Sequence, residues 1–182
     1  MFRRTQGERQ RRFEEIAMPH LDTLYRTALY MTGRREPAED LVQDTYLAAY
    51  AAFDRFDGRY PRAWLLTILR HTRISQLRHA GQAPLLLEMD GDTEAEEWPD
   101  LVSDSVEGEV LADILPEALE RAVAALPEAW RIAVVLADVE GLSYQEIAQV
   151  MDCPIGTVMS RLYRGRRRLE VLLRRQREAH CA

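Results

Sequence analysis

The sequence contains no lysine, only two cysteines and no long hydrophobic run. All 24 of its basic residues are arginine. This bias fits either a GC-rich genome or a need for the guanidinium fork, which binds phosphate and guanine edges in bidentate fashion. The cysteines Cys153 and Cys181 cannot form a disulfide framework or a zinc cage by themselves. Cys153 is more typical of a small buried residue than of a redox sensor.

Sequence signals for membranes and for enzymes are also missing. No apolar stretch approaches the roughly 18 residues of a transmembrane helix, and the N-terminal residues lack the apolar core of a secretory signal. We therefore expect a cytoplasmic protein with no membrane contact of its own. No P-loop, G-x-S-x-G or dinucleotide motif occurs, and no metal-ligand spacing joins the four histidines, which are His20, His71, His79 and His180. The sequence predicts no enzyme, no cofactor and no metal site.

The net charge of −6 and the pI near 5.3 argue, taken alone, against nucleic-acid binding. The charge is unevenly distributed, however. Residues 1–79 hold 14 Arg and 10 acidic residues, residues 80–120 hold no Arg and 13 acidic residues, and residues 121–182 hold 10 Arg and 7 acidic residues. Two basic blocks flanking an acidic one indicate separate modules joined by a linker. The acidic block is either a solvated linker with two apolar docking spots or a strand that imitates nucleic acid in a partner's basic channel.

Apolar residues in both basic blocks recur at steps of three and four, which is typical of helices. In the first block we expect one helix over 13–31 ended by Gly33, a second over 37–53, a loop over 56–61 and a third helix with Trp64 inward. In the second block we expect an apolar stripe over 111–125, a helix opened by Pro127 and ended by Gly141, a short helix to about 151 and a long one over 155–175.

No strand pattern competes, so the sequence predicts an all-α fold of two small helical domains joined by an acidic flexible linker. The expected boundaries are a disordered arm over 1–9, a first domain over 10–79, the linker over 80–110, a second domain over 111–176 and a tail over 177–182.

The strongest local signal indicates a helix-turn-helix. Ser143 and Glu146 form a capping-box pattern before the short helix, a turn follows at 152–154, and the last helix is rich in arginine. One face of that helix is apolar, and the other carries residues suited to base edges, namely Thr157, Ser160, Arg161 and Arg164. Arg166 and Arg167 follow, suited to phosphates. A solvated amphipathic helix is the alternative, but its place after a capped helix and a turn favours DNA.

Several segments, taken in order, resemble the two conserved domains of extracytoplasmic-function (ECF) sigma factors. Residues 38–46 and 62–70 resemble the first domain, and residues 126–128, 138–148 and 154–166 resemble the second. The likeness covers about 10–79 and 111–175, and the core at 156–162 resembles the actinobacterial oxidative-stress branch. It implies a sigma factor that binds core RNA polymerase, recognises the −10 and −35 promoter elements, melts the promoter and directs initiation of a stress regulon.

The resemblance also implies roles for individual residues. Those on the second helix that would grip the polymerase β′ clamp helices are Asp40, Leu41, Gln43 and Asp44, although periodicity alone makes Leu41 a core residue. Those facing the −10 element are Arg62, Arg70, His71, Arg73 and Arg78 on the third helix, with Asp57, Arg59 and Tyr60 in a loop that captures a flipped base. Those facing the −35 element are Thr157, Ser160, Arg161, Arg164, Arg166 and Arg167. The pair Tyr60–Pro61 departs from the family's small polar loop, and spacing favours Trp64 as core.

The implied partners are core RNA polymerase (its β′ clamp helices and β subunit), promoter DNA and an anti-sigma factor, which is zinc-binding in the oxidative-stress branch. Anti-sigma factor and polymerase are expected to exclude each other, and the acidic segment is expected to run towards the RNA exit path. A different class remains open, namely a dimeric helix-turn-helix regulator that binds an operator without polymerase. The first block shows no β-α alternation, so a receiver domain is not indicated.

Overall fold

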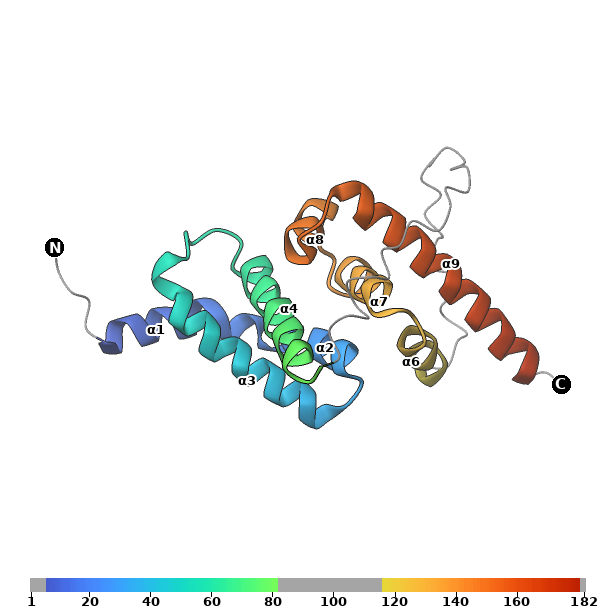
Figure 1. Cartoon of the computed structure of the whole chain (residues 1–182), viewed down its shortest axis with the longest axis horizontal. Coiled ribbons are helices and arrows are strands. Elements are labelled where there is room, and N and C mark those ends of the chain that lie inside the picture. The colour runs from blue at the N-terminus through green and yellow to red at the C-terminus, as the bar shows by residue number, and fades with distance from the viewer. Residues whose placement is uncertain (1–5, 82–115, 181–182) are drawn as a thin grey trace.

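The computed structural model describes residues 6–81 and 116–180, which form two groups of helices (Figure 1). The first group contains α1 (Gln6–Ala17), η1 (Met18–His20), α2 (Leu21–Thr32), α3 (Arg35–Ala52), η2 (Phe53–Arg55) and α4 (Pro61–His79). The second contains α6 (Pro116–Ala124), α7 (Glu128–Val134), η4 (Val135–Val139), α8 (Tyr144–Met151) and α9 (Ile155–His180). Over these two ranges there is no strand, which confirms the all-α prediction. Most of the expected linker lies outside the described residues.

The single helix expected over 13–31 is wrong, because the chain changes geometry at Pro19. Residues Met18–His20 form a 3-10 turn between α1 and α2, with the proline at its start. Proline has no backbone N–H and its ring clashes with the preceding turn, so it is tolerated at the start of a helix and not inside one. The apolar stripe nevertheless continues across the break, since Ala17 and Leu24 are both fully buried.

The disordered arm expected over 1–9 is also wrong for residues 6–9, which belong to α1. Arg9 holds this first turn against the end of α3, because its guanidinium donates to the Tyr50 carbonyl oxygen at 2.6 Å and to the Asp54 carboxylate at 3.1 Å. It also stacks over the Tyr50 ring, 4.2 Å from the centroid. A charge-assisted pair and a cation-π contact together order the helix start.

The predicted helix ends agree with the structure where glycine or proline marks them. Gly33 takes a φ of +70° and its N–H binds the Leu29 carbonyl at 2.8 Å, which closes α2. Helix α3 starts at Arg35, so Pro37 lies in its first turn, and α4 begins at Pro61. At the other end of the chain, Pro127 precedes α7. Helix α9 runs to His180, beyond the expected end at 175, because no glycine or proline interrupts it after Gly165.

Leucines and aromatic rings fill the first helical group. Leu24 of α2, Leu41 of α3 and Leu65 of α4 belong to the same buried cluster, and each has 0% of its surface accessible to solvent. Phe13 of α1 meets three rings edge-on, with centroids 5.2 to 6.1 Å away, which are Tyr46, Tyr50 and Phe53. Burying a side chain of this size stabilises the fold by about 1.5–3 kcal/mol, so the helices of this group support one another.

The second group is built around α7 and α9, which approach closely at Gly165. A β-carbon at this position would lie 2.8 Å from a methyl group of Val134 and 3.4 Å from Trp130 Cβ. Between α7 and α8 the helix widens into the π-helical segment η4, and Gly141 then closes the turn with a φ of +65°. Such π segments are rare and often lie at functional sites. This segment sets the position of Glu140.

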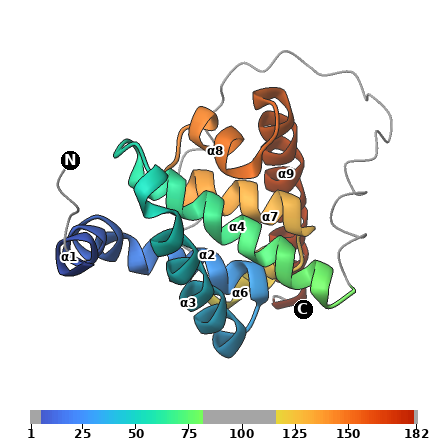
Figure 2. The same cartoon turned by 60° about the vertical axis from the view of Figure 1, so that its left-hand side comes forward.

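The two groups pack against each other. Figures 1 and 2 show α4 beside α7 and α8 from both directions, and α8 contacts α4 while α7 contacts α2. The buried apolar side chains of both groups belong to one continuous cluster. The charge pattern predicts two separate modules and gives no sign of this contact.

Candidate nucleic-acid interface

The residues expected to face polymerase lie on α3, and one of them is misplaced by the sequence prediction. Asp40, Gln43 and Asp44 are exposed, whereas Leu41 has no accessible surface. We therefore correct the assignment of Leu41, which packs inside the first group as its periodicity indicated. Asp44 accepts a hydrogen bond from the Gln76 amide of α4 at 3.0 Å, and this bond fixes the carboxylate at the edge of the surface.

A shallow hollow of about 410 Å³ lies beside these side chains, between α2 and α3. Apolar and acidic groups line it together, namely Leu21, Asp22, Tyr25, Glu39, Val42 and Gln43. A partner helix with an apolar anchor flanked by basic residues has the matching chemistry. Of these six residues only Gln43 was predicted to face a partner, so the hollow adds five to the candidate surface, which are Leu21, Asp22, Tyr25, Glu39 and Val42.

The loop between η2 and α4 has a rigid base and an exposed tip. Phe56 stacks on Trp64 at 4.3 Å and on Phe53 at 6.5 Å, which confirms that Trp64 packs against the core. Tyr60 at the tip is 67% exposed and has a φ of +51°, a conformation that is uncommon outside glycine. The loop therefore presents a phenol ring to solvent.

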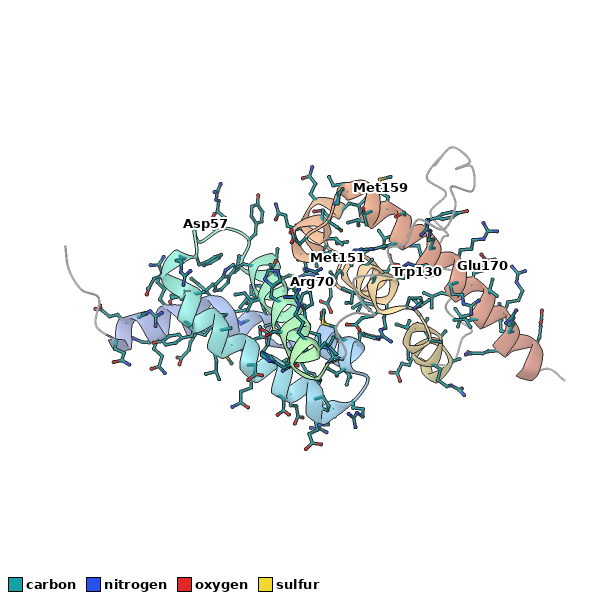
Figure 3. All side chains as sticks on the ribbon, viewed as in Figure 1. Asp57, Arg70, Trp130, Met151, Met159 and Glu170 are labelled. Carbon is teal, nitrogen blue, oxygen red and sulfur yellow. The ribbon has the colours of Figure 1, made fainter. Side chains whose placement is uncertain are left out.

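Asp57 and Arg59 brace the same loop. The Asp57 carboxylate accepts the Arg59 backbone N–H at 2.9 Å and its guanidinium at 3.0 Å. These bonds, the backbone one first, lower the pKa of Asp57. Figure 3 shows Asp57 on this loop, apart from Arg70 on α4. The three residues predicted for base capture thus share one exposed loop.

The five basic residues predicted on α4 do not share one face. Successive residues of an α-helix turn by about 100°, so Arg62 and Arg73 lie on one side while His71 and Arg78 lie on the opposite side. His71 and Arg78 are exposed, and Arg62, Arg70 and Arg73 are half-buried. The prediction of outward positions along α4 is therefore wrong for Arg62, because its side of the helix faces the second helical group.

The helix-turn-helix prediction is confirmed by the geometry of α8 and α9. The Ser143 hydroxyl accepts the Glu146 N–H at 3.3 Å, and the Glu146 carboxylate accepts the Ser143 N–H at 2.8 Å. The Ser143 hydroxyl also donates to the Glu146 carboxylate at 2.7 Å, and this bond, followed by the one from the Ser143 backbone, lowers the pKa of Glu146. Asp152 ends α8 in the left-handed conformation with a φ of +49°. The turn then places the N-terminus of α9 at the surface.

Arg161 is misplaced by the sequence prediction, because it is only 8% exposed. One of its guanidinium nitrogens lies 3.5 Å from the Cys153 sulfur in the turn. Arg161 is three residues after Val158, which is fully buried, and residues three apart are neighbours on a helix. In this structure Arg161 fastens the turn to α9 and does not point outward.

The other predicted residues of α9 lie nearer the surface. Thr157, Ser160 and Arg164 are half-buried, and the Ser160 hydroxyl donates to the Thr157 carbonyl oxygen at 2.9 Å. The sequence analysis missed two exposed apolar side chains on the same helix end, Ile155 at 42% and Met159 at 37%. Figure 3 places Met159 near the start of α9. Such side chains suit contact with thymine methyl groups.

Arg166 and Arg167 are exposed, and both are held by neighbours. Arg166 binds both carboxylate oxygens of Asp138, at 2.6 and 3.1 Å, and this hydrogen bonding raises the Arg166 pKa. Arg167 donates to the Tyr163 hydroxyl at 3.0 Å. The fork of Arg166 is therefore oriented by η4 before any phosphate arrives.

Glu140 joins the two helical groups, and its sequence pattern gives it no role of its own. Its side chain is 2% exposed, and Arg26 of α2 binds both of its carboxylate oxygens at 2.9 and 3.2 Å. The Arg62 guanidinium of α4 donates to the Glu140 carbonyl oxygen and lies 3.8 Å from its carboxylate. A negative side chain at a helix C-terminus is disfavoured by the helix dipole, and this was the available signal that Glu140 needs a partner.

Neither a metal-binding cluster nor a membrane-spanning helix occurs among the described residues. Within 6–81 and 116–180, no three His, Cys, Asp or Glu side chains gather closely enough to hold a metal ion. No helix in the same two ranges is long and apolar enough to span a bilayer.

Two helical domains in this order, the second with a capped helix-turn-helix, are the architecture of a sigma-70-type initiation factor. Residues 16–82 match the family described as "Sigma-70 region 2", and residues 116–169 match "Sigma-70, region 4". The chain is 32% identical over 158 residues to the ECF RNA polymerase sigma factor SigE of Mycolicibacterium smegmatis, covering 86% of this chain and 60% of the relative. It is 35% identical over 136 residues to the ECF RNA polymerase sigma-E factor of Escherichia coli, covering 72% of this chain and 71% of the relative.

Among solved structures, the sigma factor RpoE of Bartonella quintana, in complex with the anti-sigma factor NepR, is similar with a TM-score of 0.68 and 32% identity. The likeness covers 89% of this chain and 96% of that one. The chain belongs to the ECF sigma factor family, whose members are transcription initiation factors and not enzymes.

Proposed function

We propose that this chain is an alternative sigma factor that joins core RNA polymerase in the cytoplasm and directs it to promoters with particular −10 and −35 elements. The observation that carries the proposal is the pairing of a region 2 domain with a region 4 helix-turn-helix in one chain, in the family's order. Promoter recognition is assigned to two exposed features, the 57–60 loop and the start of α9. Polymerase binding is assigned to Asp40, Gln43 and Asp44 and the hollow beside them.

The −35 contact is assigned to the half-buried polar residues of α9 and to its two arginines at 166 and 167. Thr157, Ser160 and Arg164 lie where a helix-turn-helix presents its recognition helix to the major groove. Arg166 and Arg167 supply phosphate contacts, which set position and not sequence. Arg161 supports this surface from beneath, through the turn at Cys153.

The −10 contact is assigned to Asp57, Arg59 and Tyr60. An exposed phenol ring at the tip of a braced loop has the shape for stacking on a base that has left the duplex. Aromatic stacking on one base contributes about 1–3 kcal/mol in single-strand binding. The exposed Arg78, together with Arg70, supplies positive charge along α4 for the phosphates beside it, and the exposed His71 lies where it can hydrogen-bond to them.

An anti-sigma factor is proposed as the restraining partner, because the sigma factor of Bartonella quintana was solved with one and its structure is similar over most of this chain. Membership of the actinobacterial oxidative-stress branch, and with it a zinc-binding anti-sigma factor, is supported by the 156–162 segment alone. Because one partner would cover the surfaces that polymerase and promoter need, its binding and that of polymerase exclude each other. A stable ternary complex on a sizing column would contradict this exclusion.

Run-off transcription tests the proposal. Core polymerase is mixed with a promoter library, with and without the full chain, and initiation is expected only when the chain is present. Arg164→Ala is expected to weaken −35 discrimination by about 1–3 kcal/mol if it contacts a base, while Arg174→Ala, at an exposed surface pair with Glu170, is the matched control. Failure to initiate on any promoter, or dimeric operator binding without polymerase, would refute the sigma factor proposal and favour a helix-turn-helix regulator.

A further inference from the structure

The contact between the two helical domains covers one side of α4, and we infer that it is an autoinhibitory closed state that polymerase or promoter must open. Its centre is the Glu140 cluster, which we define as Glu140 with Arg26 and Arg62. The inference rests on the proposed function, because it concerns access to the promoter-facing helix. It adds a regulatory contact that needs no second protein.

The first observation is the position of the covered surface. Arg62 lies one residue inside α4, directly after the 57–60 loop and Pro61, and it donates to a carbonyl oxygen of the other domain. Arg73 lies on the same side of α4, three turns further on, near α7, where the charge of Glu128 attracts it and that of Arg131 repels it. Two of the arginines predicted for the −10 element thus lie half-buried on the side of α4 that region 4 covers. In the closed state Arg62 is held by a backbone carbonyl of region 4, which competes with phosphate for its guanidinium.

The second observation is the quality of the central contact. Arg26 grips Glu140 with two parallel N–H···O bonds, the arrangement in which arginine binds a carboxylate most strongly. The Glu140 side chain is 2% exposed, so the loss of a partner leaves a charge without water around it. The π-helical segment η4 and the left-handed Gly141 place Glu140 in this position. The closed arrangement is therefore built into the backbone.

The third observation shows that the contact is suited to opening. The Nε atoms of Arg62, Arg73 and Arg131 are buried without a hydrogen-bond partner among the described residues. A buried donor without a partner costs free energy, so the interface is less favourable than its central cluster alone. Each of these atoms regains a partner when the domains separate and water or phosphate reaches it. A contact with one strong cluster and several unsatisfied donors is suited to a switch.

A related sigma factor has a similar structure over a length that includes both domains. The likeness to the Bartonella quintana structure, at a TM-score of 0.68, covers 89% of this chain and so includes both domains. That protein was solved with an anti-sigma factor bound. In the present chain the arrangement is held by its own residues, so a restraining partner would stabilise a state that already exists.

The test uses Arg26→Gln, because simple electrostatics and the closed state predict opposite signs for it. Losing a positive charge weakens DNA binding if nothing else changes. Losing the Glu140 cluster frees Arg62 and Arg73 and strengthens DNA binding. Arg35→Gln is the matched control, because it makes the same substitution at an exposed pair, in which Arg35 binds Glu39 one turn further along α3. Neither Arg26 nor Arg35 is assigned to DNA or to polymerase.

Two readouts are measured on the full chain without polymerase. Small-angle X-ray scattering gives the radius of gyration, and fluorescence anisotropy gives affinity for a fluorescein-labelled single-stranded 20-nucleotide random DNA. We expect Arg26→Gln to enlarge the radius of gyration and to bind the DNA severalfold more tightly than the wild type. We expect Arg35→Gln to keep the radius and to bind equally or more weakly. An unchanged radius with weaker binding in Arg26→Gln would overturn the inference.

A second variant guards against misfolding. Glu140→Gln removes the charge with little change of shape and should also enlarge the radius, and circular dichroism verifies that helical content is kept. The double variant should expand no further than either single one, because both remove the same contact. Run-off transcription by the wild type separates the two proposals. Initiation without any expansion of the variants refutes the closed state alone, whereas expansion without initiation refutes the sigma factor proposal and leaves the domain contact without an inhibitory role.

Discussion

Replacing Gly165 by alanine tests whether the close approach of α7 and α9 holds the second domain together. The new Cβ would lie 2.8 Å from a methyl carbon of Val134, closer than real Cβ contacts allow, and 3.4 Å from Trp130 Cβ. Val134 is 4% exposed and β-branched, so its methyl group cannot turn away easily. Overpacking of this kind costs about 1–3 kcal/mol, against a gain of about 1 kcal/mol from replacing glycine in a helix.

The net expectation is a loss of about 1 kcal/mol in the free energy of unfolding, which lowers Tm by about 2–4 °C in a chain of this size. Gly156→Ala is the control, because it is the same substitution in the same helix with no atom within 4 Å of the new Cβ. It should stabilise the protein by up to about 1 kcal/mol. Urea unfolding followed by circular dichroism measures both.

A third variant, Gly165→Ala combined with Val134→Ala, removes the clashing methyl group. Its loss should be smaller than the sum of the two single losses, because the two substitutions share one contact. If Gly165→Ala proved as stable as the Gly156→Ala control, the close contact between α7 and α9 would be refuted as a stabilising feature.

Three further outcomes follow from named contacts. Ser143→Ala removes the α8 capping box and should cost about 1 kcal/mol in urea unfolding, whereas an unchanged midpoint would show that the cap is dispensable. Burial and the Arg62 charge lower the pKa of His20, so near pH 6.5 the unfolded chain binds more protons than the folded chain. The free energy of unfolding should therefore fall as the pH drops below about 6.5, and His20→Gln should flatten this dependence on pH. Burial raises the pKa of Glu128, so Glu128→Gln should raise Tm more at neutral pH than at about pH 4, and equal shifts would contradict the burial.

Local patterns predicted most of the helices because their causes are local. Gly33 and Gly141 end helices through positive φ values, and the Ser143 capping box needs only residues within one turn. The apolar stripe of α1 and α2 identified the core correctly but hid the break at Pro19, because the 3-10 turn keeps the next apolar residues on the inner side. The apolar periodicity therefore predicted which residues are buried more accurately than it predicted where a helix ends.

The candidate site was harder to predict because exposure depends on distant neighbours. Arg161 looks outward on a helix drawn alone, yet the turn at Cys153 covers it. Nothing in the sequence of α4 indicates that Arg62 meets Glu140 or that Arg73 lies near Glu128 of α7. Leu41 was assigned to a surface by family likeness although its spacing indicated the core, and here the spacing was right. Long-range contacts of this kind leave no trace in helical periodicity.

The Glu140 cluster determines how the closed state depends on the concentration of the protein. Its carboxylate and its two guanidinium partners belong to one chain, so their encounter is intramolecular and does not depend on how many copies the cell contains. A separate inhibitor is outnumbered when its target is overproduced, but a contact within the chain is made afresh in every molecule. The fraction of closed molecules would therefore stay the same in a dilute and in a concentrated solution.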